Sequence, residues 1–412
     1  MPSRNLQREF AERVIQKLRS AGYEAYWAGG CVRDQLIGRV PQDYDVATSA
    51  RPDQVRDLFG HRRTLAIGVA FGVISVLNGR QYAPIEVATF RSDGAYLDGR
   101  HPMAVVFTTP EEDARRRDFT INGLFYDPLT EEVIDYVGGQ EDLRLGRIRA
   151  IGEPRERFAE DKLRMLRAVR FAATLGFQIE PATFAAIQSM AAEIHVVSAE
   201  RIGGEMRRIL VHPQRALGCQ LLFESGLLAQ IMPTSAAEFV QDPDCFHNAL
   251  RVLECLETKS LAVAIAALNW NSGDAKSIRQ QGRSFRFSNK ETDRAAWLHD
   301  HLSFVDGATT MPWPQLQRCL VHPGIQELME LANAVLGATH EGVLLCQEKL
   351  QLPIAQLNPP ELITGDDLIA HGLQPGRYFA QLLETLRNAQ LEGQIQSREQ
   401  ALELVDVWMR EG

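Results

Sequence analysis

The sequence contains no CxxC pair of cysteines, although it has six cysteines in all. They are spread through mostly apolar segments, as Cys31, Cys219, Cys245, Cys255, Cys319 and Cys346. Structural zinc sites and disulfide frameworks need cysteines at characteristic spacings, so the sequence predicts neither. Scattered thiols of this kind are typical of a reducing compartment, and we expect a cytoplasmic protein.

Long apolar runs and a surplus of positive charge are also missing. No stretch approaches the roughly 18 apolar residues that cross a bilayer, and the polar, helix-like start favours neither a signal peptide nor a lipid anchor. The chain has 44 Lys and Arg against 53 Asp and Glu, a net charge of -9. Any contact with nucleic acid must therefore come from local basic patches, and residues 141–215 carry a small basic surplus.

The 412 residues have an ordinary globular composition, with 45% apolar and 24% charged residues, and their number suggests two to four domains. Hydrophobic periodicity in the first 140 residues predicts helices and strands in alternation. The expected helices are 4–21, 32–38 and 51–59, and the expected strands are 23–30, 43–48, 69–79 and 82–91. After about residue 150 the pattern is helical to the end. We therefore predict a mixed α/β domain followed by an all-α region.

A glycine turn and two acids form the most informative segment. Gly29 and Gly30 follow a predicted strand, so the backbone there can approach a ligand closely, and Arg33 lies within reach of a bound phosphate. Asp43 and Asp45 alternate along the next predicted strand, which puts both carboxylates on one face. Two like charges on one face repel unless a cation lies between them, and Mg²⁺ is the usual choice.

A third acid, Glu86, lies in the strand-like segment IEVATFR. Each feature alone has an ordinary explanation, because paired acids are often solvated and Glu86 could be an edge-strand surface charge. Together, the glycine turn, the acid pair and the third acid describe a two-metal site for phosphoryl or nucleotidyl transfer.

Three arginines, Arg115, Arg116 and Arg117, come next, followed by Asp118 and Asn122. The run could be a solvated basic face. Interleaved apolar residues anchor it to a packed element instead, which suits arginines that hold a triphosphate and polar side chains that bind ribose hydroxyls.

Acidic and basic residues recur every three positions at Asp161, Arg164, Arg167 and Arg170. On a helix this spacing predicts one polar stripe beside an apolar one. The stripe could be solvated and held by ion pairs. Alternatively, an Asp acceptor beside an Arg donor can read a base edge, while further arginines hold phosphate.

The ordered motifs resemble those of the class II tRNA nucleotidyltransferases and bacterial poly(A) polymerases. They are WAGGCVRDQLIG, QDYDVAT, FGVISV, IEVATFR, DGRHP, RRDFTING, DYVGGQEDL and EDKLRMLRAVRFAA, within about residues 20–215. SAERIGGEMRRIL (198–210) resembles that family's neck-closing helix, and LITGDDLIAHGLQPGRYF (362–379) resembles its tail segment.

The resemblance implies a role for each matching position. Catalytic and metal-binding roles fall on Asp43 and Asp45, with Glu86 as a third catalytic acid. Nucleotide-binding roles fall on Gly29, Gly30, Arg33, Arg116, Arg117, Asp118, Asn122, Asp161, Arg164, Arg167 and Arg170. Among these, Asp161 and Arg164 match the protein template that pairs with the incoming base.

The resemblance also implies an α/β nucleotidyltransferase head domain followed by all-α neck, body and tail domains. We expect the head at 1–145, the neck at 146–215, the body at 216–340 and the tail at 341–412, with RNA bound by the body and tail. Many relatives carry a metal-hydrolase segment with His-Asp pairs in the body. Here His247 is retained, but Asn269 stands in place of the later pair, and His299-Asp300 lies beyond the expected position, so we expect no phosphohydrolase.

The implied activity is addition of CCA, from CTP and ATP, to the 3′ end of tRNA with two Mg²⁺ ions, without an obligate protein partner. Addition of A alone, as in a poly(A) polymerase or an A-adding tRNA enzyme, stays open at this point. A third alternative is an inactive RNA-binding protein on the same scaffold, which the presence of both Asp43 and Asp45 disfavours.

The segment 91–113 is rich in Gly, Asp and Pro, which predicts a mobile loop. Because a loop is easier to rearrange than a helix, we expect this one to switch the pocket from C to A. Deletion of residues 93–102 is then expected to spare CC addition and remove the terminal A.

Overall fold

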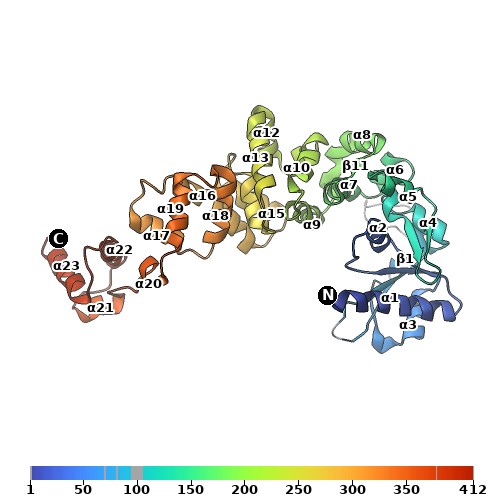
Figure 1. Cartoon of the computed structure of the whole chain (residues 1–412), viewed down its shortest axis with the longest axis horizontal. Helices are drawn as coiled ribbons and strands as arrows, with labels where there is room; N and C mark the ends of the chain where they lie inside the picture. Colours follow the sequence, from blue (N-terminus) through green and yellow to red (C-terminus); the bar gives the residue numbers. More distant parts are fainter. Residues whose placement is uncertain (1, 69–70, 80–81, 94–104, 377, 412) are drawn as a thin grey trace. The chain divides into compact units, whose positions relative to one another are not determined.

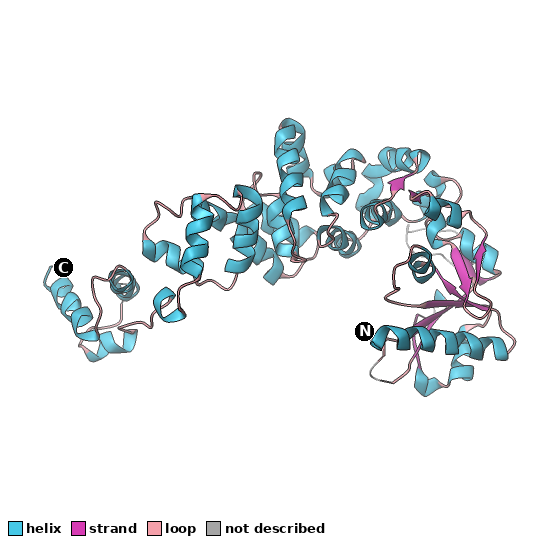
Figure 2. Cartoon of the chain, in the orientation of Figure 1, coloured by secondary structure: helices cyan, strands magenta, loops and turns pink. Residues whose placement is uncertain are grey.

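The computed structural model describes residues 2–68, 71–79, 82–93, 105–376 and 378–411 (Figure 1). The chain divides into two compact units, Met1–Gln241 and Asp242–Gly412. All described strands belong to the first unit, and the second is built from helices (Figure 2). The predicted architecture, an α/β domain followed by helical domains, is confirmed.

A seven-stranded sheet organises the first unit, with strand order β3-β4-β5-β2-β1-β8-β9. Its strands are β1 (Ala25–Ala28), β2 (Asp45–Thr48), β3 (Thr64–Gly68), β4 (Val73–Val76), β5 (Ile85–Thr89), β8 (Leu124–Asp127) and β9 (Glu132–Asp135). Strands β2 and β5 are parallel, and the other neighbours are antiparallel. Two short pairs lie outside the sheet: β6 (Arg91–Asp93) with β7 (Val105–Phe107), and β10 (Arg147–Ile148) with β11 (Gln178–Ile179).

Helices cover and extend this sheet. Those of the first unit are α1 (Pro2–Ser20), α2 (Gly30–Leu36), α3 (Pro52–Phe59), α4 (Pro110–Arg115), α5 (Gly139–Arg144), α6 (Pro154–Glu160), α7 (Leu163–Leu175), α8 (Pro181–Met190), α9 (Ala199–Leu210), α10 (Arg215–Glu224), α11 (Leu227–Ile231) and α12 (Pro233–Gln241). Short 3₁₀ turns span η1 (His61–Arg63), η3 (Thr120–Asn122) and η4 (Ala191–Val196).

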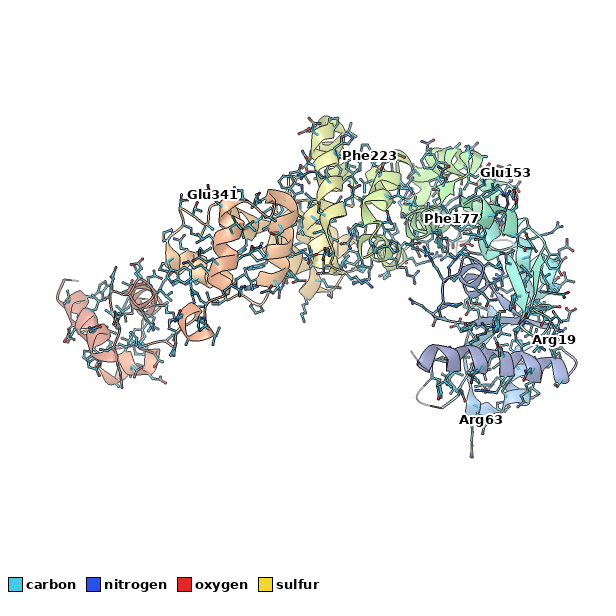
Figure 3. All side chains as sticks on the ribbon, viewed as in Figure 1. Arg19, Arg63, Glu153, Phe177, Phe223 and Glu341 are labelled. Carbon is cyan, nitrogen blue, oxygen red and sulfur yellow. The ribbon has the colours of Figure 1, made fainter. Side chains whose placement is uncertain are left out.

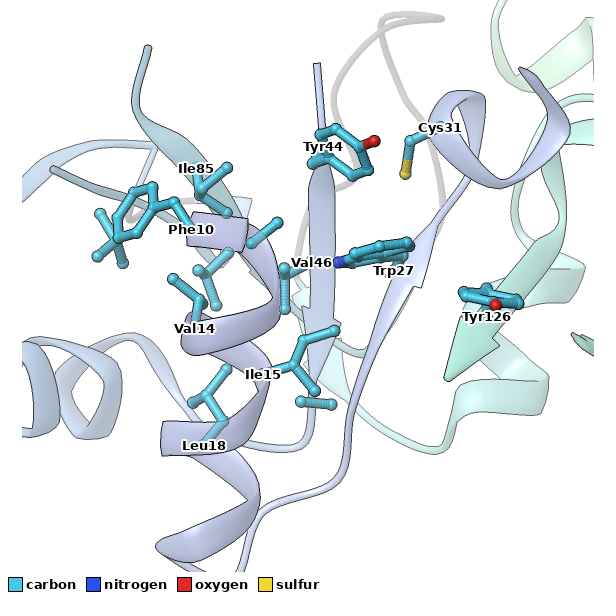
Figure 4. Packing of buried hydrophobic residues seen from close by; sticks show 14 of the residues in the cluster. Phe10, Val14, Ile15, Leu18, Trp27, Cys31, Tyr44, Val46, Ile85 and Tyr126 are labelled. Atoms are coloured by element: carbon cyan, nitrogen blue, oxygen red, sulfur yellow. The ribbon is translucent and has the colours of Figure 1, made fainter. Parts of the chain in front are cut away.

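Successive side chains of each strand point to opposite faces of the sheet, so the sheet has one face that packs against α1 and a second face on the other side. Val46 of β2 joins α1 in one apolar cluster, whereas Ala47 belongs to a smaller cluster on the other side (Figure 4). Trp27 of β1 is fully buried in the first cluster and stacks on Tyr126 with 5.5 Å between ring centroids. Truncating so large a buried ring costs about 3–5 kcal/mol. Because a one-residue shift in register would move these buried side chains to the opposite face, the core face fixes the register of the strands, and with it which side chains face the polar side.

Helix α1 is tied to the sheet at its C-terminal end. Arg19, labelled in Figure 3, donates to the Asp127 carboxylate of β8 at 2.5 Å and to the Ala25 carbonyl at 3.3 Å. The helix ends at Ser20, and Gly22 takes a φ of 87°, which favours glycine because it lacks a side chain.

The helices of the second unit are α13 (Pro243–Cys255), α14 (Leu261–Leu268), α15 (Ala275–Ser284), α16 (Asn289–Asp306), α17 (Trp313–Leu320), α18 (Ile325–Leu336), α19 (Glu341–Leu350), α20 (Ile354–Leu357), α21 (Gly365–Ala370), α22 (Tyr378–Leu391) and α23 (Arg398–Glu411). Helices α13, α16 and α18 pack on α14, whereas α21, α22 and α23 share a separate apolar cluster. Every residue of α14 is buried, as its uninterrupted apolar sequence requires. Among the described residues, no helix is both long and apolar enough to span a membrane.

The sequence pattern missed strands β3, β8 and β9 of the sheet, and one loop prediction was wrong. Strand β3 was missed, because Thr64–Gly68 follows a basic turn and has little alternation. The segment 91–113 was expected to be a loop, but its described part forms β6, β7 and α4, since Val105–Phe107 is β-branched and aromatic and Thr109 caps a helix. Residues 94–104, and with them most of the proposed 93–102 deletion, lie outside the described residues.

Candidate active site

A cavity of about 530 Å³ lies in the first unit, over the face of the sheet opposite α1. Twelve of the residues predicted from the sequence line it: Gly29, Gly30, Arg33, Asp45, Glu86, Arg116, Arg117, Asp118, Asn122, Arg164, Arg167 and Arg170. The other two, Asp43 and Asp161, are not among its lining residues. The cavity therefore collects side chains from widely separated parts of the sequence.

The glycine turn lets the backbone approach the arginines closely. Gly29 takes a φ of 72°, and a Cβ there would lie only 2.9 Å from Nη1 of Arg117. Arg33, on the helix that follows, is nearly buried and donates to the Asn122 side-chain oxygen at 2.7 Å. Any side chain at position 29 would therefore be strained and would displace Arg117.

Two carboxylates meet where the parallel strands pair. Asp45 of β2 and Glu86 of β5 are register partners, so their side chains project side by side into the cavity. Protein surrounds Asp45 on most sides although it still contacts water. This burial, together with the charges of Glu86 and Asp43, raises the Asp45 pKa to about 6, despite the opposing effect of Arg117.

Asp43 lies just before β2 rather than in it, a correction to the predicted strand 43–48. The alternation nevertheless holds, because Asp43 and Asp45 are exposed and Tyr44 between them is buried. Among the described residues, no group of three His, Cys, Asp or Glu side chains is assembled tightly enough to hold a metal ion.

A buried acid that the sequence reading missed organises the arginine cluster. Asp113, with no exposed surface, accepts hydrogen bonds from Arg116 at 2.7 Å and from Arg117 at 2.9 Å. Burial would raise its pKa, but the two guanidinium groups outweigh burial and lower it. The spacing of three and four residues within helix α4 and its end was the signal that could have revealed this pairing.

Asp118 is held from two sides. One carboxylate oxygen accepts from the Asn122 amide at 3.0 Å, and the other accepts from Arg167 at 2.6 Å. Burial alone would raise the Asp118 pKa, yet Arg167 and Asn122 bring it down to about 2. Because both oxygens already have partners, the predicted contact of Asp118 with a ribose needs one of these bonds to be shared or exchanged.

Helix α7 supplies one wall of the cavity. Arg164, Arg167 and Arg170 all line it, at the predicted spacing of three residues. Phe171, which was not predicted, packs against the guanidinium groups of Arg167 and Arg170, at 5.3 and 3.9 Å from its ring centroid. Glu205 of α9, also missed, lies 2.5 Å from Arg170 and is nearly fully buried.

Asp161 does not lie on the helical stripe, so that prediction was wrong. It follows α6 in an extended conformation, two residues before α7 begins. One oxygen accepts the Leu163 backbone N–H at 3.1 Å, just before α7, and the other binds Arg201 of α9 at 2.6 Å. Arg164 instead binds Glu160 at 2.6 Å and the Arg116 carbonyl at 3.2 Å.

Two histidines of the second unit, His247 and His301, have structural partners within their own helices. The His247 ring nitrogen lies 2.8 Å from the Pro243 carbonyl within α13, and His301 stacks on Trp297. Asn269, where a His-Asp pair would stand in a hydrolase, is buried and donates to the Ile265 carbonyl at 2.8 Å.

Three family models match successive parts of the chain. The Poly A polymerase head domain matches residues 25–149, the RNA and SrmB-binding site of polymerase A matches 176–239, and the tRNA nucleotidyltransferase domain 2 matches 256–405. The first of these spans the sheet, the carboxylates and the arginines Arg33, Arg116 and Arg117, whereas the arginines of α7 lie beyond it.

Similar proteins cover nearly the whole chain. A CCA-adding enzyme of Levilactobacillus brevis is 34% identical over 96% of this chain and 96% of its own length. One from Lactiplantibacillus plantarum is 34% identical over 95% of this chain and 94% of its own. The crystal structure of the Bacillus stearothermophilus CCA-adding enzyme in complex with CTP covers 98% of both chains, with 29% identity and a TM-score of 0.77.

Proposed function

Because this chain belongs to the CCA-adding family of tRNA nucleotidyltransferases, we propose that it adds C and A, from CTP and ATP, to the 3′ end of tRNA. One observation of the geometry carries the proposal: a carboxylate pair on β2 and β5 faces six arginines across a single cavity. Such a cavity suits a nucleoside triphosphate, with its phosphates among the arginines and its α-phosphorus near the carboxylates.

Arginines that are fixed in advance hold the triphosphate in this proposal. Asp113 anchors one edge of Arg116 and of Arg117, so these guanidinium groups need little reordering when phosphate oxygens arrive. Arg33 is held by Asn122 and Asp34 in the same way. The 3′-hydroxyl of the RNA then attacks the α-phosphorus, and pyrophosphate leaves while bound to the arginines.

We propose that two Mg²⁺ ions are held by Asp43 and Asp45, with Glu86 beside them. The donor set fits, because Mg²⁺ prefers carboxylate oxygens and needs only one or two from the protein, with phosphate and water as its other ligands. Burial first, and the charges of Glu86 and Asp43 after it, raise the pKa of Asp45, and a bound cation would offset both effects. When bound, Mg²⁺ lowers the pKa of the attacking hydroxyl and offsets charge on the phosphates. Glu86 is the neighbouring group that can accept the hydroxyl proton.

Base selection is assigned to Asp161 and Arg164 in this proposal. Both side chains have protein partners in the nucleotide-free chain, Arg201 for Asp161 and Glu160 for Arg164. Reading a base therefore requires Asp161 to exchange its bond with Arg201 for one with the nucleotide. Asp118 and Asn122 are assigned to the ribose, and Arg167 and Arg170 to further nucleotide contacts.

The test is a set of addition reactions with tRNA that ends before CCA or after CC. Each RNA is incubated with CTP, ATP or both, with Mg²⁺ and with EDTA in its place, and the products are sized. We expect CC from CTP alone, complete CCA from both nucleotides, and no product with EDTA. Addition of A to the CC-ending RNA without any C addition would replace this proposal with an A-adding enzyme.

The expected partners are thus tRNA, CTP and ATP, without an obligate protein partner. We place the reaction in the cytoplasm. Five of the six cysteine thiols are buried, which fits a reducing compartment.

A further inference from the structure

A second cavity, of about 590 Å³, lies behind the wall of the first and is just as large. It opens between the turn after β9, the segment 149–157 and the start of α8, all within the first unit. Arg115, Arg149 and Arg157 line it, together with Tyr136 and one acid, Glu180. None of these residues is used in the proposed reaction.

Two of the three arginines, Arg149 and Arg157, are held in place from behind, whereas Arg115 is exposed and pairs with the exposed Glu111. Asp142, which has no exposed surface, binds Nε of Arg149 at 2.7 Å, and Glu160 binds Arg157 at 2.9 Å. Among the described residues, no acceptor bonds to the two terminal amino groups of Arg149, whose side chain is 40% exposed. A guanidinium fixed at one edge and open at the other is suited to bidentate binding of a phosphate.

The remaining lining suits an organic group beside the phosphate. Val137, Ile151 and Pro154 form an apolar wall, and the half-exposed Tyr136 ring stands at the edge. Glu180 opposes an anion, but one of its oxygens accepts the Thr183 N–H at 2.7 Å at the start of α8. Another acid, Glu153 (labelled in Figure 3), is exposed and lies between the lining residues Gly152 and Pro154 in sequence.

The two cavities share their dividing wall. Arg115 and Thr120 line the second cavity, whereas Arg116 and Asp118 between them line the first. The Arg157 carbonyl accepts from Arg164 at 3.0 Å, and the Thr120 N–H donates to the Arg149 carbonyl at 3.0 Å. A ligand that shifts Arg149 or Arg157 therefore also shifts backbone carbonyls that are bonded to Thr120 and to Arg164, the arginine proposed to read the base.

We propose that this second cavity binds a phosphorylated nucleotide unit, with the phosphate on Arg149, Arg157 and Arg115 and the base or sugar against Tyr136 and the apolar wall. The unit comes either from the RNA strand or from a free nucleotide. Both sources share this chemistry. Binding of the RNA strand rests on the proposed function, whereas binding of a free nucleotide does not.

The matched variants are Ala182→Glu and Ala182→Gln. Ala182 is exposed, lines the second cavity and lies in the first turn of α8, where an acid favours the helix, so both variants are expected to fold. Glutamate adds a negative charge at the phosphate position, and glutamine adds the same bulk without the charge. If Ala182→Glu does not fold by thermal unfolding, Arg115→Gln, at a site with 64% side-chain exposure, takes its place.

Two measurements separate the sources. Equilibrium dialysis with labelled CTP counts bound nucleotide: for a free nucleotide we expect about two per chain in the wild type and in Ala182→Gln, and about one in Ala182→Glu. Addition kinetics test whether the bound unit belongs to the RNA strand. In that case we expect Ala182→Glu to raise the KM for tRNA about tenfold while the KM for CTP stays unchanged. The slope of log RNA affinity against log salt should fall by about one, for one lost phosphate contact.

Loss specific to Ala182→Glu in either measurement supports the proposal and identifies the source. If Ala182→Glu and Ala182→Gln behave alike in both, the second cavity binds no phosphate and its arginines are only internal ion pairs. Equilibrium dialysis measures nucleotide binding and does not depend on catalysis. It therefore tests the second cavity even if the chain adds no nucleotide to tRNA.

Discussion

At the scale of single residues, Asp45 combines a charge that its surroundings disfavour with a proposed role in the reaction. Burial and two neighbouring acids raise its pKa to about 6, so its ionised form is disfavoured in the nucleotide-free chain. We expect Asp45→Asn to reduce nucleotide addition by about a hundredfold or more, because the proposed Mg²⁺ site loses one of its carboxylates. The free energy of unfolding is expected to stay equal or rise.

Kinetics and urea unfolding measure the two effects separately. Asp57→Asn is the control, since that acid is exposed in the same unit with a side-chain exposure of 75%. Addition by Asp45→Asn at the wild-type rate would remove this residue from the proposed site.

Asp113 makes a different prediction, because its charge is fully compensated. Removing one partner of a buried ion pair leaves the others unpaired, so Asp113→Asn is expected to cost about 3–5 kcal/mol of stability and to raise the KM for nucleotide. Glu111→Gln is the matched control on the same helix, because its exposed pair with Arg115 is worth only about 0–1 kcal/mol. Equal effects in the two variants would contradict the anchoring role.

Asp118 gives the chain an acid-sensitive contribution to stability. Its pKa is about 2 in the folded chain against the ordinary value of 3.8, so the ionised form stabilises the fold at every pH above about 4. That contribution, about 2 kcal/mol, is lost as the pH falls from about 4 to about 2. Urea unfolding of the wild type and Asp118→Asn should therefore differ at pH 6 and converge towards pH 2. A constant difference across this range would assign the effect to something other than this titration.

At the scale of secondary-structure elements, regular patterns made strands β1, β2, β4 and β5, the first three helices and the helical character of the rest of the chain predictable, but not strands β3, β8 and β9. The acids of β2 and β5 were foreseen on neighbouring strands, because alternation fixes which side chains share a face. What could not be foreseen depends on long-range pairing. Asp161 has the spacing of a helical stripe, but it lies before the helix, where it binds Arg201, 40 residues later in the sequence. Asp113 was missed because it anchors Arg116 and Arg117 only by being buried beside them, and sequence spacing alone does not reveal burial.

The start of α7 is the element on which selectivity is expected to depend. Asp161→Ala should alter the preference between CTP and ATP, or admit UTP and GTP, because the base loses an acceptor. Lys162→Gln is the control, since it breaks a neighbouring ion pair to Glu193 at 2.7 Å at the same helix start. Steady-state kinetics with the four nucleotides measure both variants. If selectivity changes equally in the two, only the anchoring of the helix matters.

At the scale of the whole molecule, the negative charge is unevenly divided. Residues 1–241 carry 30 basic and 31 acidic side chains, whereas residues 242–412 carry 14 and 22. The unit with the arginine-lined cavity is thus almost neutral. RNA that binds the helical unit, as we expect, meets a surface of net negative charge. Its basic side chains are concentrated at Lys276, Arg279, Arg283, Arg286 and Lys290, with no acid from 275 to 290.

This basic segment covers α15 and its junction with α16, where Arg283 and Lys290 are exposed. We expect the double variant Arg283→Gln/Lys290→Gln to raise the KM for tRNA and to lower the slope of log affinity against log salt by about two, one for each lost phosphate contact. The KM for CTP should not change, because the nucleotide cavity lies in the other unit. Lys349→Gln is the control: this lysine is half-exposed and already paired with Glu348 at 3.2 Å, so its loss should leave the salt slope unchanged. A double variant with the wild-type salt slope would show that RNA reaches the helical unit through another surface.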